Sequence, residues 1–155
     1  ADAGNVISKK LIKIKKNYDS NLVYKKLIKV GRKQIREILL KIRTKKLKSF
    51  LQKNSTSNYW RRRSELDGRI DWRMDAENIN NLIKALAKPY PGAYFLFKEK
   101  KIRVWKSRVV KSNKKNYEPG KIIRLKKNLV IKCGNKALQL ITFSPKINLK
   151  GATYL

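Results

Sequence analysis

The stretch of sequence that decides the fold runs from residue 93 to residue 143: AYFLFKEKKIRVWKSRVVKSNKKNYEPGKIIRLKKNLVIKCGNKALQLITF. It contains five short runs of β-branched, aromatic and other apolar residues, and polar or glycine-containing turns separate them. Such runs predict β-strands. Five antiparallel strands in so short a stretch must hide their edges, and a small OB-like barrel is one way to do so.

The residues just before this stretch have the period of a helix instead. Apolar residues recur at positions i, i+3, i+4 and i+7 and predict a helix over residues 76–87: Ile79, Leu82, Ile83 and Leu86. Asp75 can cap its start, and Pro89 ends it. The change of period at residues 89–92 predicts a rigid corner between helix and sheet.

Residues 20–47 predict two more amphipathic helices. Asp19 and Ser20 are typical N-cap residues, and Gly31 is a typical stop signal, so the first helix is expected to end there. A second apolar stripe follows Gly31: Ile35, Ile38, Leu39 and Ile42. The loose alternation of residues 6–16 predicts one or two short strands.

The fold class expected from these patterns is α+β, in three parts. Residues 1–51 carry two helices, and residues 52–69 form a polar, aperiodic linker with Asn, Ser and Gly punctuation. Residues 70–155 carry one helix and the small OB-like antiparallel barrel.

Composition excludes several kinds of chemistry. The 155 residues include one Cys and no His, which excludes an internal disulfide, an ordinary zinc site and a self-contained Ser-His or Cys-His centre. The single cysteine makes a reducing cytoplasm the expected location. Apolar residues make up 41%, enough for a core, yet no apolar run approaches the ~20 residues that span a bilayer, so no membrane partner is expected.

The net charge of +31 has two readings. It favours contact with nucleic acid, but 30 of the 41 basic residues are Lys, and Lys, Ile and Asn together make up 59 residues. All three amino acids have A/T-rich codons, so an A/T-rich genome accounts for much of the charge. In either case we expect non-specific adhesion to nucleic acid that falls with salt.

Three groups of residues could carry chemistry. Five carboxylates crowd into residues 65–77 and could do acid–base work, but salt bridges and helix capping explain them better. Trp60 and Arg61, Arg62 and Arg63 could stack a base and hold phosphate, or could pack the linker onto a neighbouring domain. Cys133 lies in an apolar run and is expected to be a buried, inert thiol.

Taken in order, these pieces resemble the C-terminal half of the 10-formyltetrahydrofolate-dependent formyltransferases, which include methionyl-tRNA formyltransferase and nucleotide-sugar N-formyltransferases. The opening Asp2-Ala3-Gly4-Asn5-Val6-Ile7 is similar to the family's Asp-Thr/Ala-Gly-Asp-Ile-Ile segment. Gln52, Tyr59 and the three arginines fit its linker. The most specific likeness runs from Asp67-Gly68-Arg69-Ile70-Asp71-Trp72 to Pro91-Gly92-Ala93.

The resemblance implies that a primary amine attacks the formyl carbon of 10-formyltetrahydrofolate. The family uses an Asn, a His and an Asp, and only the Asp has a counterpart here, Asp2. In the family this Asp orients the His, which belongs to an N-terminal half that also binds the folate. The chain is therefore expected to be a fragment, a split gene product or a partial record. It should be inactive alone and should work with its missing half in cis or in trans.

Two acceptor amines are compatible with the family resemblance, and a third interpretation of the chain lies outside the family. The segment Trp60–Ser64, with Asp67-Gly68 and Asp71–Met74, resembles the sugar-type members more closely, which favours a nucleotide-linked amino sugar. The alternative is methionyl-tRNA, whose acceptor arm the basic linker would hold. The outside reading is a stand-alone OB-type RNA-binding module.

Overall fold

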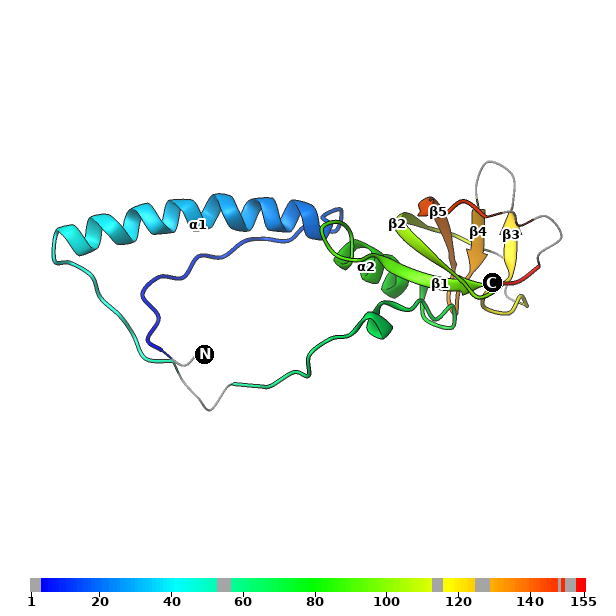
Figure 1. The fold of residues 1–155 in the computed structure, drawn as a ribbon, viewed down its shortest axis with the longest axis horizontal. Helices are drawn as coiled ribbons and strands as arrows, with labels where there is room; N and C mark the ends of the chain where they lie inside the picture. Colours follow the sequence, from blue (N-terminus) through cyan, green and yellow to red (C-terminus); the bar gives the residue numbers. More distant parts are fainter. Residues whose placement is uncertain (1–3, 53–56, 113–115, 125–128, 148, 150–152) are drawn as a thin grey trace. The chain divides into compact units, whose positions relative to one another are not determined.

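A computed structural model describes residues 4–52, 57–112, 116–124, 129–147, 149 and 153–155 (Figure 1). The chain divides into two compact units, one of residues 1–18 with 22–62 and the other of residues 19–21 with 63–155. No helix in the described residues is long and apolar enough to cross a membrane.

The first unit is built around one long helix, α1, which spans Ser20–Arg43. The predicted stop at Gly31 is wrong, because the helix continues through this residue. A single glycine inside a helix costs only about 1 kcal/mol relative to alanine, and the apolar spacing continues across it from Leu27 and Val30 to Ile38. The helix ends at Arg43, before Leu47, and two residues later Lys45 has a left-handed φ of 55°.

The strands predicted for residues 6–16 are also absent from the structure, except at one point. Val6 and Phe50 form an isolated antiparallel bridge, with N···O distances of 2.9 and 3.0 Å. Two side-chain contacts attach the following residues to α1: Gln34 donates to Ser8 at 2.9 Å, and Lys10 pairs with Glu37 at 3.0 Å. A strand needs a neighbouring edge, and the described residues of this unit offer one only at Phe50.

The second unit contains the sheet predicted from residues 93–143. A 3₁₀ turn, η2 (Glu65–Gly68), and a helix, α2 (Ala76–Ala85), precede five strands. The strands are β1 (Ala93–Phe97), β2 (Lys100–Val110), β3 (Ile122–Arg124), β4 (Leu129–Lys132) and β5 (Ala137–Ser144). The predicted α+β class is confirmed, with all five strands where the sequence placed them.

The strands form one antiparallel sheet in the order β1-β2-β5-β4-β3, curled into a half-barrel. The long strand β2 bends where its pairing with β5 shifts register, between Val104 and Ser107. Short neighbours cover both edges of the sheet. Arg69 bridges Tyr94 on β1, and Tyr154 bridges Lys121 just before β3.

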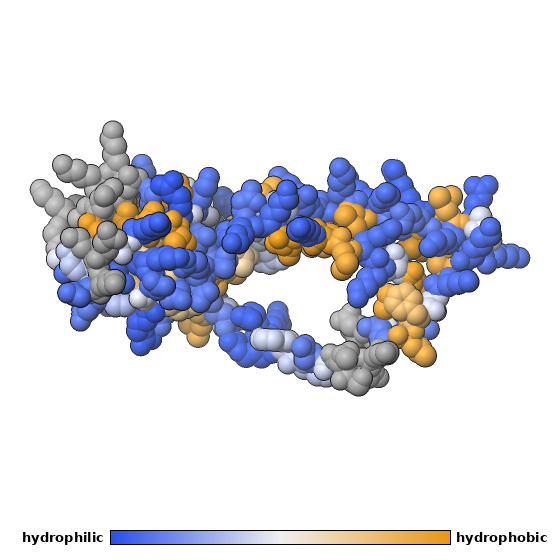
Figure 2. Space-filling view, turned by 180° about the vertical axis from the view of Figure 1, so that it is seen from behind, coloured by the Kyte–Doolittle hydropathy of each residue, from blue (hydrophilic) through white to orange (hydrophobic). Residues whose placement is uncertain are grey.

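The core of this unit lies between α2 and the concave face of the sheet. The helix contributes Ala76, Ile79 and Ile83, all fully buried, and the sheet contributes residues such as Phe95, Ile102 and Leu138. In the first unit, by contrast, no described residue is buried. Figure 2 shows apolar side chains open to solvent there, among the hydrophilic ones.

Candidate functional site

Asp2, the predicted catalytic residue, lies outside the described residues. The structure does describe what holds the chain just after it. The side-chain amide of Gln52 donates to the Gly4 carbonyl oxygen at 2.7 Å, and Asn5 donates to Ser49 at 3.2 Å. With the Val6–Phe50 bridge, these contacts fasten residues 4–6 to residues 49–52. Sequence reasoning did not foresee this role of Gln52.

The predicted contact residues of the linker lie on the surface. The side chains of Tyr59 and Trp60 are 97% and 77% exposed, so Trp60 does not anchor the linker by burial. Its indole N–H donates to Asn58 at 3.1 Å. Arg61, Arg62 and Arg63 are all exposed. Four residues of the predicted linker, 53–56, lie outside the described part.

The clustered carboxylates of residues 65–77 serve structure. Glu65 pairs with Lys101 at 2.7 Å and with Arg103 at 3.5 Å. Asp67 accepts the Ser64 backbone N–H at 2.7 Å, which closes the turn of η2. Glu77 pairs with Lys136, and Asp75 occupies the N-cap position of α2 without a capping hydrogen bond from its side chain. No group of metal-binding side chains occurs among the described residues.

Asp71 has the most strongly shifted carboxyl group of this cluster. It accepts hydrogen bonds from the Arg73 side chain, at 2.6 to 3.1 Å, and from the Arg73 backbone N–H at 2.9 Å. These bonds lower the pKa of Asp71 to about 2 from an ordinary value of 3.8. Hydrogen bonds from Lys101 and Lys136 likewise lower the pKa values of Glu65 and Glu77. Permanently ionised carboxylates cannot serve as general acids near neutral pH.

The segment from Ile70 to Met74 is held from two sides. At its start, the Ile70 N–H donates to the Tyr94 carbonyl at 2.6 Å. Further along, the Gly134 N–H lies 3.0 Å from the carbonyl oxygens of both Trp72 and Met74. A Cβ atom on Gly134 would lie 2.1 Å from the Arg73 carbonyl oxygen, so only glycine fits this turn.

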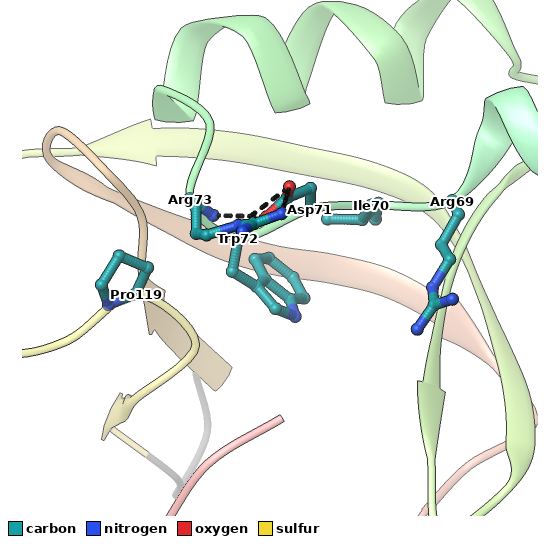
Figure 3. A pocket seen from close by; sticks show the side chains of 6 residues that line it. All are labelled: Arg69, Ile70, Asp71, Trp72, Arg73 and Pro119. Carbon is teal, nitrogen blue, oxygen red and sulfur yellow. Dashed lines mark hydrogen bonds and ion pairs between the residues drawn. The ribbon is translucent and has the colours of Figure 1, made fainter.

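This segment forms one wall of a pocket of about 510 Å³ (Figure 3). The Trp72 side chain is only 7% exposed, and its ring packs on Phe95 with centroids 5.5 Å apart. Figure 3 shows the indole and the Arg69 guanidinium projecting to the same side of the segment. The lining residues are Arg69, Ile70, Asp71, Trp72, Arg73 and Pro119.

Cys133 is fully buried, as predicted, and burial raises the pKa of its thiol to about 12. The neighbouring Lys132 is also buried, at 6% exposure, and its ammonium group donates to the Cys133 and Gly134 carbonyl oxygens. Lys132 therefore supports the turn after β4 that holds Trp72.

Comparison with known families assigns this architecture. Residues 63–155 match the model of the formyl transferase C-terminal domain. The chain belongs to the formyltransferase family. The match covers the η2 turn, the segment at Trp72, α2 and the whole sheet, which confirms the resemblance seen in the sequence.

Two curated relatives extend the likeness to most of the chain. Methionyl-tRNA formyltransferase of Caldanaerobacter subterraneus subsp. tengcongensis is 34% identical over 90% of this chain and 45% of its own length. The bifunctional polymyxin resistance protein ArnA of Wigglesworthia glossinidia brevipalpis is 36% identical over 91% of this chain and 21% of its own length. This formyltransferase chain thus spans less than half the length of either relative.

Solved structures share the fold at lower identity. HypX from Aquifex aeolicus, in complex with tetrahydrofolic acid, aligns with a TM-score of 0.69 at 17% identity, over 92% of this chain and 25% of its own. WlaRD, a sugar 3N-formyl transferase solved with dTDP and 5-N-formyl-THF, aligns with a TM-score of 0.66 at 17% identity. The alignment covers 94% of this chain and 52% of WlaRD.

Proposed function

We propose that this chain is the C-terminal part of a formyltransferase that moves a formyl group from 10-formyltetrahydrofolate to the amine of a nucleotide-linked amino sugar. Membership of the formyltransferase family supports the type of reaction, which is formyl transfer. The sugar acceptor is supported by the likeness of residues 60–74 to sugar-type members. The fold shared with WlaRD is compatible with it.

Exposed apolar residues on α1 support the view that more of the catalytic domain packs against the first unit. Ile28, Ile35, Leu39 and Ile42 are 40–59% exposed and recur at i, i+7, i+11 and i+14, which puts them on one face of the helix. A helix of 24 residues with no buried side chain gains little from its own unit. We propose that the N-terminal half, in cis or in trans, covers this face and binds the folate.

Asp2 is the catalytic residue that this chain would contribute. A carboxylate beside an imidazole selects the ring's tautomer and stabilises its protonated form. The imidazole comes from the other half, because this sequence has no His. We propose that the Gln52 bond to Gly4 helps to position Asp2 by fixing the backbone two residues after it.

A second acceptor has a specific observation in its favour. One relative, 34% identical to this chain, is a methionyl-tRNA formyltransferase, and the +31 charge suits a tRNA partner. No comparable observation favours the third interpretation, a stand-alone RNA-binding module. Relatives that span 90% of the chain include residues that a separate barrel would lack.

The deciding experiment is an acceptor assay with 10-formyltetrahydrofolate, using the full-length protein or this chain mixed with its separately expressed N-terminal half. Formylation of a nucleotide-linked amino sugar, and not of methionyl-tRNA, is the expected result. Formylation of methionyl-tRNA alone would replace the sugar with the alternative acceptor. Formylation of neither would refute the proposed function.

Two controls separate the role of this chain from that of its missing half. The pure 155-residue chain should transfer no formyl group to either acceptor. In the complete protein, Asp2→Asn should retain the fold, as judged by circular dichroism, and lose activity by a factor on the order of 10⁴. Turnover by the isolated chain, or an active Asp2→Asn protein, would contradict the assigned roles.

A further inference from the structure

The pocket beside Trp72 carries two hydrogen-bond donors that nothing else in the described structure uses. No described residue accepts a bond from the Trp72 indole N–H. Because no fully buried side-chain nitrogen in the described residues lacks a partner, this N–H must be accessible to solvent, and Trp72 lines the pocket. The Arg69 guanidinium is exposed and forms no ion pair with any described carboxylate. Figure 3 shows both groups on the same side of the segment.

The charge of the pocket favours an anion. Among the described residues that line it, Asp71 is the only carboxylate, and the Arg73 side chain satisfies that carboxylate through several hydrogen bonds. Arg69 therefore leaves one positive charge uncompensated. A guanidinium and an N–H donor together suit the oxygen atoms of a phosphoryl group, because charge-assisted bonds to phosphate are among the strongest in proteins.

Apolar side chains also line the pocket, although polar atoms make up the larger part of its lining. These side chains are Ile70, Trp72 and Pro119. The volume of about 510 Å³ lies in the usual range of small-ligand pockets and far exceeds that of a single phosphate. A ligand that matches both parts has a flat or apolar body and an anionic end. We propose that this pocket binds a nucleoside diphosphate through Arg69 and the Trp72 indole N–H.

The choice of a nucleotide rests on the proposed function, since a nucleotide-linked sugar carries a nucleoside diphosphate. The binding measurement needs no catalysis, so the two proposals can fail separately. If UDP fails to bind, the pocket assignment is wrong and the acceptor assay still decides the proposed function. If the acceptor proves to be tRNA, the proposed function is wrong and the binding measurement still decides whether this pocket takes UDP.

The test follows the three indole N–H signals of the ¹⁵N-labelled 155-residue chain by NMR while UDP, inorganic pyrophosphate or uridine is added. UDP should shift the Trp72 signal saturably, pyrophosphate should do so more weakly, and uridine should leave it unchanged. Shifts confined to Trp60 or Trp105, or none, would overturn the proposal. A short single-stranded RNA that shifts Trp72 where UDP does not would also overturn it.

Two substitutions sharpen the test. Arg69→Gln should weaken UDP binding at least about tenfold, because a charge-assisted bond is lost. The matched control Arg108→Gln removes an exposed arginine of β2 that bonds Gln139 and does not line the pocket, so it should change affinity less than about twofold. Asp71→Asn should strengthen binding by releasing Arg73. Equal losses in Arg69→Gln and Arg108→Gln would show general charge attraction and refute the site.

Discussion

At the scale of single residues, the chain uses its few carboxylates to fix local structure. Asp71 shows the effect most clearly, because it bonds both the backbone and the side chain of Arg73, two positions further along. This pairing shapes the exposed turn that follows Trp72. The Arg73 guanidinium also offsets the charge of this carboxylate, so the described lining of the pocket keeps the net positive charge of Arg69.

The Asp71–Arg73 pair should make stability depend on pH in a defined window. The folded-state pKa of Asp71, about 2, lies below its ordinary 3.8, so its ionised form stabilises the fold. The contribution is fully present above pH 4 and is lost as pH falls through 2. Urea unfolding at several pH values should show wild type more stable than Asp71→Asn at pH 6, with most of this difference gone at pH 2. A difference that persists unchanged to pH 2 would contradict this.

At the scale of elements, two glycines have opposite roles. Gly31 lies inside α1 with open space around it, whereas Gly134 lies in the turn after β4, against the backbone of Arg73. The first glycine is a cost that the helix tolerates. The second is required, because the turn and the Trp72 segment approach each other so closely.

Gly31→Ala should strengthen α1. Alanine favours a helix interior by about 1 kcal/mol over glycine, and no heavy atom lies within 4 Å of the added Cβ. Circular dichroism at 222 nm should show equal or greater helix content and a higher midpoint of helix melting. A loss of helix signal would instead support a helix end at residue 31.

Gly134→Ala should have the opposite effect. A Cβ placed 2.1 Å from the Arg73 carbonyl oxygen forces the turn or the segment to move, and loss of the Gly134 bonds would follow. We expect destabilisation of roughly 1–3 kcal/mol or more in urea unfolding, as for overpacked sites. The Trp72 indole signal should move even without ligand. A Gly134→Ala protein as stable as wild type would contradict this, because it would show that the turn moves at no cost to accept the added Cβ.

At the scale of the whole molecule, the charge of +31 is spread over both units, with net +13 in residues 1–51 and +15 in residues 89–155. Such a dispersed charge predicts weak binding to any polyanion, driven by counterion release and reduced steeply by salt. A tRNA-specific enzyme would instead depend on a few positions. Arg61, Arg62 and Arg63 are the candidates, because they are adjacent and exposed.

A salt titration with initiator tRNA and a generic tRNA separates these cases. For a sugar enzyme, both tRNAs should bind equally and dissociate as salt rises to ~0.2 M. An initiator preference that survives this salt and disappears in an Arg61–Arg63 triple Ala variant would overturn the sugar acceptor. Each lost phosphate contact would then cost roughly 1.5–3 kcal/mol.

The sequence by itself determined the local features of this protein. All five strands and α2 follow from residue spacing, because the period of 2 or 3.6 is a property of consecutive residues. The buried state of Cys133 and the capping position of Asp75 follow in the same way. The family resemblance rested on motifs in the same stretch, and it too was confirmed.

Tertiary structure decided the features that join distant residues. Glu65 and Glu77 find their lysines 36 and 59 residues further along, whereas the sequence suggested nearby arginines. The sequence indicated Asp2 and Arg61–Arg63 as sites but gave no sign of the pocket. That pocket exists because the turn at Gly134 holds Trp72 beside Pro119, and spacing along a chain cannot encode such an approach.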